Sequence, residues 1–389
     1  MIRTDEEYPI MNTRSDESRI EITYDYGVTP SDMLRQRMYE LGMSQTQLAM
    51  RTGLSRKTIN ELVHGKQSIT HETALLLEPV LGYAARFWMD MQHGYDAQKA
   101  SHKRKVAESR FDDWPNVFSA AATRAMQLDV HYPQQSVLTQ LLHFFGVASY
   151  DAYTQSYGHM LQATSFRRHR QEVNPHDVAV WLRLGQRSAE SCQLAPFNER
   201  RLRQVLDDCK ALTAQTPAEF WQPLVNMFAA CGVLLVWIPP ITEIALSGAT
   251  YVHADKRVIQ LSGRGQTNDR FWFTLFHEIG HILLHGVKPL FAEWDDADTH
   301  TVQDSEREAN EFAATHLIPP TLLAPLLTKS RLSTADIVQL AQRAQVHPGI
   351  VAGRIQHERR NFATYRRLLL QYNWDFLMNP TDRRLPRQP

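Results

Sequence analysis

The stretch His277-Glu278-Ile279-Gly280-His281 combines side chains that can bind a metal ion and activate a water molecule. In a helix, residues four apart lie on one face about one turn apart, so the imidazoles of His277 and His281 can share one ion. Glu278 projects beside them, where its carboxylate can take a proton from a bound water. The pattern predicts a hydrolytic metal centre with His277 and His281 as ligands and Glu278 as general base.

The motif fixes only three residues, His, Glu and His, and such a pattern occurs by chance in many helices. The surrounding residues are therefore needed to distinguish a metal site from a chance match. Histidines inside an apolar helix are costly to bury without a partner. The context therefore favours metal binding, with Zn²⁺ as the expected ion and Mn²⁺ or another divalent metal as the alternative. The apolar neighbours are Phe271, Phe273, Leu275, Phe276, Ile279, Ile282, Leu283 and Leu284.

A catalytic zinc site usually has three protein ligands and an open fourth position. His285 follows His281 by four residues, but a common pattern with three histidines places the third six residues after the second, where this chain has Val287. We therefore expect His285 to support the ligands from outside or to lie at the helix end.

The third ligand is expected among four carboxylates on a downstream helix. Glu306 precedes Ala309 and Ala313 by three and seven residues, so it shares their buried helical stripe. Glu308 and Glu311 project more to the side, and Glu308 is the main rival of Glu306. The alternative is that all four carboxylates form a solvated helix face. The four are Asp304, Glu306, Glu308 and Glu311.

Two segments, FWFTLFHEIGHILLHG and EREANEFAATHLIPP, make residues 217–328 resemble the ImmA/IrrE family of metallopeptidases. The family pattern of Glu, two residues, a small residue and Asn is matched by Glu306, Ala309 and Asn310.

The resemblance implies that His277, His281 and Glu306 bind the metal and that Glu278 is the base of an endopeptidase. Members of this family are thought to cleave cytoplasmic transcriptional repressors, which relieves repression. The expected substrate is therefore a cytoplasmic regulatory protein, either a repressor or an antitoxin.

A second motif, MSQTQLAMRTGLSRKTINELVHGKQSIT, has the layout of a helix–turn–helix, with Gly53 at the turn and the next helix placed to read a major groove. Between residues 51 and 66 it has four basic side chains and one acidic, a local net charge of +3. The alternative is a small helical interaction domain without DNA binding. The candidate contacts to bases or phosphates are Gln45, Ser55, Arg56, Lys57, Asn60 and Lys66.

This region resembles Cro/C1-type domains, and its continuation ITHETALLLEPVLGYAARFWMDMQHGYDA looks like HigA-type antitoxins. The resemblance covers residues 29–97. It implies a repressor-like module that binds a promoter or operator as a homodimer.

Apolar spacing and turn residues predict an α+β fold that is mostly α. Strands are expected in GVLLVWI, ATYVH and RVIQLSG, and long helices over residues 269–285 and 304–317. The predicted divisions are an acidic N-terminal segment 1–28, a helix–turn–helix domain 29–97, a helical linker region 98–216, a peptidase domain with a small sheet 217–328 and a basic helical segment 329–389.

The C-terminal segment carries eleven basic and four acidic side chains over residues 329–389 and shows a weaker helix–turn–helix pattern. There Arg354, Arg359 and Arg360 could contact DNA or a repressor, but a packed helical tail with solvated arginines is the preferred interpretation. The EWDDAD stretch at 293–298 indicates an acidic surface loop rather than a calcium site.

Composition limits the function classes. The 42 basic and 42 acidic residues give zero net charge, so the chain as a whole is not a polybasic nucleic-acid coat. The three cysteines fit no disulfide framework, which favours a reducing cytoplasm. The acidic start lacks a secretory signal, and the most apolar run, residues 228–241, is too short to span a bilayer, so no membrane partner is expected.

The sequence thus predicts a cytoplasmic DNA-binding regulator with a zinc-dependent endopeptidase domain, acting in transcription control, stress response or a toxin–antitoxin-like system. The alternative is a HigA-like repressor or antitoxin whose metal site is structural or inactive.

Overall fold

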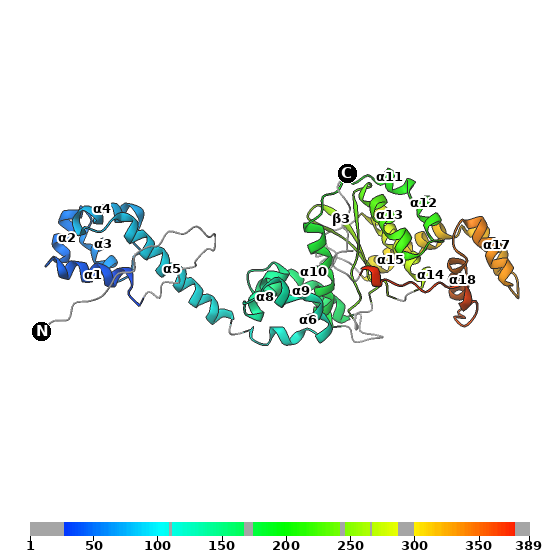
Figure 1. Cartoon of the computed structure of the whole chain (residues 1–389), viewed down its shortest axis with the longest axis horizontal. Helices are drawn as coiled ribbons and strands as arrows, with labels where there is room; N and C mark the ends of the chain where they lie inside the picture. The colour runs from blue at the N-terminus through cyan, green and yellow to red at the C-terminus, as the bar shows by residue number, and fades with distance from the viewer. Residues whose placement is uncertain are drawn as a thin grey trace, which may run out of the picture. The chain divides into compact units, whose positions relative to one another are not determined.

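The computed structural model describes residues 27–108, 111–166, 174–241, 246–264, 267–286 and 299–377. The chain divides into two compact units, Met1–Arg110 and Phe111–Pro389, which are coloured blue to cyan and cyan to red in Figure 1. Its fold is α+β and mostly α, as predicted. The acidic stretch at 293–298 lies outside the described residues. In the described part of the chain, every helix is too short or too polar to cross a membrane.

The first unit is a bundle of helices whose starts are fixed by side-chain caps. Ser44, Ser55 and Thr70 each accept a hydrogen bond from the backbone N–H three residues ahead. Gly53, with φ of +75°, ends one helix and allows the predicted turn. The helices are α1 (Pro30–Glu40), α2 (Gln45–Thr52), α3 (Arg56–Val63), α4 (His71–Leu81) and α5 (Ala85–Glu108).

The core of this unit is formed by apolar side chains at helical spacing. Leu34, Leu48, Ile59, Leu77 and Trp88 have no exposed surface. They come from five different helices, so the core holds the two helices of the motif in a fixed relation.

The second unit is built on a sheet of three short strands, where three were predicted. These are β1 (Val233–Trp237), β2 (Gly248–His253) and β3 (Lys256–Leu261). Their order is β1-β3-β2, with β1 parallel and β2 antiparallel to β3. Because successive side chains of a strand point to opposite faces, the sheet contributes to two separate cores.

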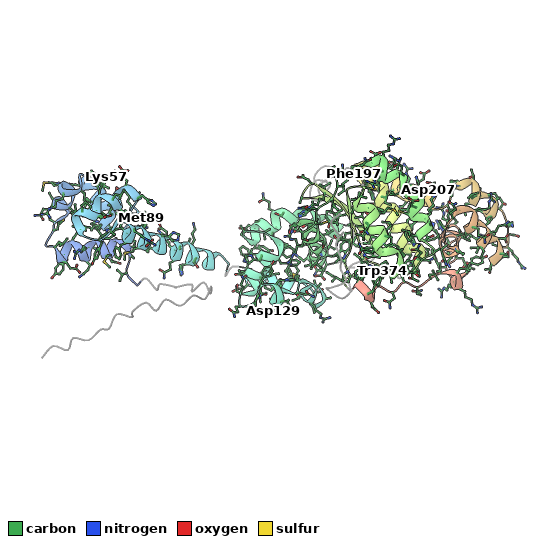
Figure 2. The ribbon with its side chains drawn as sticks, turned by 45° about the horizontal axis from the view of Figure 1, so that its top comes forward. Lys57, Met89, Asp129, Phe197, Asp207 and Trp374 are labelled. Carbon is green, nitrogen blue, oxygen red and sulfur yellow. The ribbon has the colours of Figure 1, made fainter. Side chains whose placement is uncertain are left out.

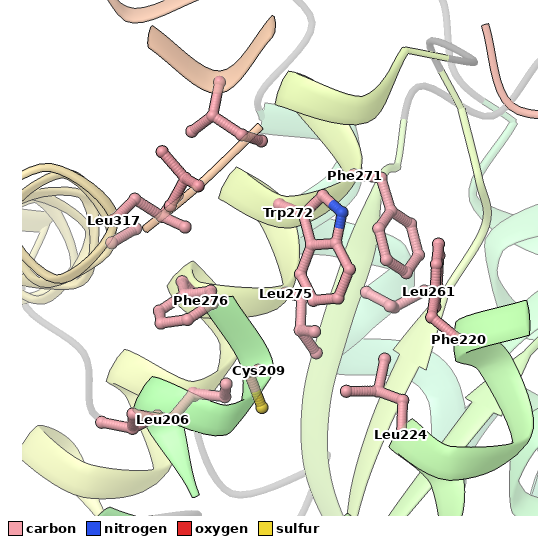
Figure 3. Close-up of a cluster of buried hydrophobic side chains, with 14 of the residues drawn as sticks. Leu206, Cys209, Phe220, Leu224, Leu261, Phe271, Trp272, Leu275, Phe276 and Leu317 are labelled. Carbon is pink, nitrogen blue, oxygen red and sulfur yellow. The ribbon is translucent and has the colours of Figure 1, made fainter. Parts of the chain in front are cut away.

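One face of the sheet is covered by α13 (Pro217–Ala229) and α14 (Asn268–Gly280), with α12 (Leu206–Leu212) packed on α13 and α15 (Thr299–Leu317) packed on α14. Figure 3 shows Trp272, Leu275 and Phe276 of α14 among apolar side chains of these elements. The chain continues from α14 through a π-helical turn, His281–His285, so the long helix predicted there is confirmed apart from the form of its last turn.

The other face is covered by α10 (Pro175–Glu190), which lies across the sheet from α13 in Figure 1. Trp181 of α10 packs with Leu234 and Val258, and its carbonyl accepts a hydrogen bond from the Gln260 side chain at 2.7 Å. Helices of residues 98–216, the expected linker region, therefore form one layer of this unit. The remaining elements of that region are η2 (Trp114–Val117), α6 (Ala120–Met126), α7 (Leu128–His131), α8 (Val137–Phe145), α9 (Tyr150–Phe166) and α11 (Glu199–Gln204).

The C-terminal helices pack against the start of α14. A Cβ atom on Gly349 would lie 2.7 Å from the side chain of Asn268, so the absence of a side chain there permits the close approach. Asn268 itself is fully buried, and its Oδ1 accepts a hydrogen bond from the Leu370 N–H. The elements are α16 (Pro320–Leu327), α17 (Thr334–Ala344), α18 (Pro348–Glu358), η4 (Arg366–Leu368) and η5 (Asp375–Leu377).

Two of the arginines considered for DNA contact in this segment bind the protein itself. Arg354 pairs with Glu358 at 2.7 Å, and Arg359 donates to the carbonyl of Lys329. These contacts favour the interpretation of residues 329–377 as a packed tail.

Small residues allow α14 and α15 to approach closely. A Cβ atom on Gly280 would lie 3.2 Å from the Cα of Ala309 and 3.2 Å from the ring of Phe312, which is tighter than ordinary contact. The Gly280–Ala309 contact therefore sets the distance between the two helices.

Replacing Gly280 by Val should lower the stability of the second unit by about 1–3 kcal/mol, because the added atoms force the helices apart. The matched control is Gly158→Val on α9, where no described atom lies within 4 Å of the new Cβ. Urea unfolding of both variants, followed by circular dichroism, measures the difference. Equal midpoints for the two variants would show that this contact is not tight.

Candidate metal centre

Three side chains, from α14, from the π-helical turn that continues it and from α15, converge on one point. The ligand atoms of His277, His281 and Glu306 all lie within 4.8 Å of one another. The two Nε2 atoms are 3.0 Å apart, and they lie 3.4 and 3.7 Å from the carboxylate of Glu306. Two ligand atoms at about 2.0–2.1 Å from one tetrahedral ion are roughly 3.3 Å apart, so this spacing fits a shared ion.

The outer nitrogen of each imidazole also has a partner. Nδ1 of His277 lies 3.1 Å from Oδ1 of Asn310, and Nδ1 of His281 lies 3.2 Å from Nδ1 of His285. Metal-binding histidines usually hydrogen-bond through the nitrogen that does not face the ion, because that bond fixes the ring. Both rings are therefore held with Nε2 toward the common point.

The helix geometry separates the four competing carboxylates. Among the described residues, Glu306 is the carboxylate whose oxygen lies close enough to both histidines to share a metal ion with them. Its rival Glu308 instead lies 3.1 Å from Nε2 of His285, and Asp304 pairs with Arg307 at 3.3 Å. Glu311 is exposed on the same helix.

Glu278 lies beneath the edge of β2. The residue is 6% exposed, and its carboxylate accepts a 2.6 Å hydrogen bond from the Thr250 hydroxyl. A Cβ atom on Gly248, two residues earlier on the same strand face, would lie 2.6 Å from Oε1 of Glu278. Strand β2 therefore fixes this carboxylate, and the absence of a side chain at Gly248 makes room for it.

Sequence reasoning missed the role of Thr250. The contact joins residues 28 apart in the chain, and no local pattern marks a single threonine in a strand. The available signal was indirect, because Gly248 and Thr250 alternate with apolar positions and so share a face.

Burial and charge act differently on the two imidazoles. Burial lowers the pKa of His277, but the hydrogen bond with Glu306 and the charges of Glu278 and Glu306 outweigh it, so the net shift is upward. Burial and the nearby His277 lower the pKa of His281 to about 4. His281 is thus neutral at pH 7, whereas a proton on His277 competes with a metal, so metal affinity should rise with pH.

The site lies at the surface of its unit. The side chains of His277 and His281 are 15% and 21% exposed, and that of Glu306 is 48% exposed. The ligand side chains are therefore partly exposed to solvent.

The candidate DNA contacts lie on α2, α3 and the turn that follows. Arg56, Lys57, Asn60 and Lys66 are exposed, and Figure 2 labels Lys57. The side chains of Arg56 and Lys66 make no hydrogen bond or ion pair with the residues that the structure describes.

The other candidates have structural partners. The Ser55 hydroxyl caps α3 by accepting a hydrogen bond from the Thr58 N–H at 3.0 Å. The side chain of Gln45 accepts a hydrogen bond from the Asn60 amide at 3.4 Å. That pair connects α2 to α3 on the exposed side of the motif, and DNA contact by these side chains stays a prediction.

Comparison with known families gives two matches. A family described as the IrrE N-terminal-like domain of M78 peptidases matches residues 234–356, which include the metal-site residues and extend into α18. A family described as helix-turn-helix matches residues 34–88.

Individual relatives match about a fifth of the chain. Virulence-associated protein I of Dichelobacter nodosus is 33% identical over 79 residues, which are 20% of this chain and 73% of that protein. An uncharacterized HTH-type transcriptional regulator of Escherichia coli K12, YddM, is 26% identical over 81 residues, which are 21% of this chain and 86% of that protein. An addiction module antidote protein of a HigA family from Coxiella burnetii is 27% identical, with a TM-score of 0.20, over 21% of this chain and 91% of that structure.

The full chain should bind about one zinc ion, and the His277→Ala/His281→Ala double variant should bind none at this site. Glu306→Ala should lower the affinity by at least about 100-fold, because one of three ligands is lost. Glu311→Ala, an exposed carboxylate on the same helix, is the control. Elemental analysis and chelator competition give the values. Full metal content in the double variant would refute the ligand assignment.

Proposed function

We propose that this chain, which has a helix-turn-helix domain over residues 34–88 and an IrrE N-terminal-like domain over residues 234–356, is a DNA-binding regulator that cleaves a regulatory protein with a metal-dependent endopeptidase site. The substrate class that fits this combination is a cytoplasmic repressor or antitoxin. Zn²⁺ is the proposed metal, with Mn²⁺ or another divalent ion as the alternative.

The observation that carries the proposal is the convergence of His277, His281 and Glu306 beside a buried carboxylate, Glu278. Three protein ligands with an accessible side are the arrangement of a hydrolytic site rather than a closed structural one. A bound Zn²⁺ would lower the pKa of its water to about 7 and polarise a peptide carbonyl.

The protein supplies the base and its orientation. Glu278 is placed one residue after His277, so its carboxylate can accept the proton of a water held at the site. The Thr250 hydroxyl holds one carboxylate oxygen through the 2.6 Å hydrogen bond, which restricts Glu278 to one orientation. Burial keeps bulk water away from this carboxylate.

The first unit would bring the peptidase to DNA. An exposed patch of Arg56, Lys57 and Lys66 around the motif gives a local positive charge for the phosphates, and Asn60 beside Gln45 offers amides for base edges. Since helix–turn–helix modules usually read two half-sites about one turn apart, we expect a homodimer on a palindromic operator.

A HigA-like repressor with a structural or inactive metal site is the second candidate. It is favoured by the low exposure of Glu278, which is bonded to Thr250 and would have to be reached by water for catalysis. The first candidate cleaves a protein and needs Glu278 to do so, whereas the second does not cleave. A variant of Glu278 therefore distinguishes the two.

Glu278→Gln should keep the fold and the metal but slow cleavage by about 10²–10⁴-fold, because the amide cannot accept the proton of water. This variant, used as a trap, should retain substrate protein from a cell extract. The captured protein, purified and identified by mass spectrometry, is then incubated with the wild type, Glu278→Gln and Glu311→Gln. Cleavage by wild type and Glu311→Gln alone is the expected result. Equal stability of the captured protein with all three would favour the repressor candidate.

Arg56→Ala should weaken binding to the promoter of the chain's own gene by about 1–3 kcal/mol and relax specificity at one base, if Arg56 makes a bidentate contact. Lys66→Ala should weaken binding to all sequences and reduce the salt dependence. Arg86→Ala is the control, since this arginine is 90% exposed on α5, outside the motif. Gel-shift titrations at two salt concentrations measure these effects, and failure of the wild type to bind any promoter fragment would favour an interaction domain.

A further inference from the structure

A chain of hydrogen bonds runs from α15 to the metal ligand His281, in the π-helical turn that follows α14. It begins at the carboxylate of Glu308, passes through the His285 ring and ends at the His281 ring. We propose that Glu308 and His285 are positioning residues that fix His281 in the tautomer whose Nε2 is free to bind a metal. The inference deepens the proposed function, because it concerns the same site.

The direction of the first bond follows from the chemistry of Glu308. An ionised carboxylate can only accept hydrogen bonds, so Nε2 of His285, at 3.1 Å, must be the donor. A neutral imidazole has one N–H and one lone pair. In the neutral form of His285, with its one proton on Nε2, the Nδ1 atom is therefore an acceptor.

The direction of the second hydrogen bond, between the Nδ1 atoms of His281 and His285, then follows. Nδ1 of His281 lies 3.2 Å from the acceptor Nδ1 of His285, so His281 must donate its Nδ1–H. Its Nε2 is left with the lone pair, and this atom is the one that faces His277 at 3.0 Å and Glu306 at 3.7 Å. A carboxylate that does not touch the ligand thus sets which nitrogen of the ligand is available.

The helix geometry supports this alignment. His277, His281 and His285 follow one another at intervals of four, and the last five residues, His281–His285, form a π-helical turn. Such turns are rare and frequently occur at functional sites. Among the described residues, the group that could hold a metal ion is His277, His281 and Glu306, without His285. The contacts of His285 therefore indicate that it supports His281 and does not bind the metal itself.

The first test measures metal affinity of the full chain by zinc competition with a chelator. His285→Ala and Glu308→Ala should each lower the affinity by about 10- to 100-fold, as is common when a partner of a metal-binding histidine is removed. His285→Gln should recover most of the loss if its amide oxygen accepts the Nδ1–H of His281. Glu311→Ala, on the same helix, should have no effect.

The second test reads the tautomer directly and needs no metal. Long-range ¹H–¹⁵N NMR of the metal-free full chain at pH 8 distinguishes Nδ1–H from Nε2–H imidazoles, and the His281 signals are assigned by their loss in His281→Gln. The wild type should show the Nδ1–H form of His281. Glu308→Ala should show a mixture of the two forms.

The outcomes separate this inference from the proposed function. Unchanged zinc affinity in both His285→Ala and Glu308→Ala, with zinc bound by the wild type, would overturn the inference and leave the metal site intact. Absence of zinc binding in the wild type would refute the proposed function. The NMR measurement of the His281 tautomer would then still test the inference. An Nε2–H form of His281 in the wild type would overturn it in either case.

Discussion

The close contact between α14 and α15 is the constraint on which the metal site depends. Gly280 lies within the histidine motif, and a side chain on it would meet the backbone of Ala309 at 3.2 Å. Because the two helices can approach this closely, Glu306 on one reaches the histidines on the other. The same approach places Asn310 and Glu308 where they can hold the rings from outside. One small residue thus links the packing of the unit to its chemistry.

The sheet acts as the second support of the site. Its front face, toward α14, carries Thr250, which holds the carboxylate of Glu278. Its rear face packs against α10, where the Gln260 side chain donates a hydrogen bond to the Trp181 carbonyl. Tyr251, the neighbour of Thr250, donates to the Gln260 side chain at 2.7 Å on that rear face. The rear helical layer therefore helps to fix the strand that orients the base, although no residue of that layer belongs to the candidate site.

Local patterns predicted the parts of this structure that local forces determine. Helical spacing and caps gave the helix–turn–helix and the two metal-bearing helices, and helical periodicity placed Glu306 with the histidines before any contact was known. The role of Thr250 depends on how a strand packs across a helix, which no short window of sequence contains. The turn between β2 and β3 lies in the gap between the two expected strands, but its backbone form was hidden, because Ala254 and Asp255 adopt positive φ of 48° and 61° without the glycine that usually marks such a turn.

Anomalous diffraction tests most directly whether His277, His281 and Glu306 together hold one metal ion. Crystals of the full chain grown with zinc, measured on both sides of the zinc absorption edge, should show one strong anomalous peak in this unit. We expect the peak to lie about 2.0–2.2 Å from Nε2 of His277, Nε2 of His281 and a carboxylate oxygen of Glu306. A peak bound instead by His285 and Glu308, or no peak at these helices, would contradict it.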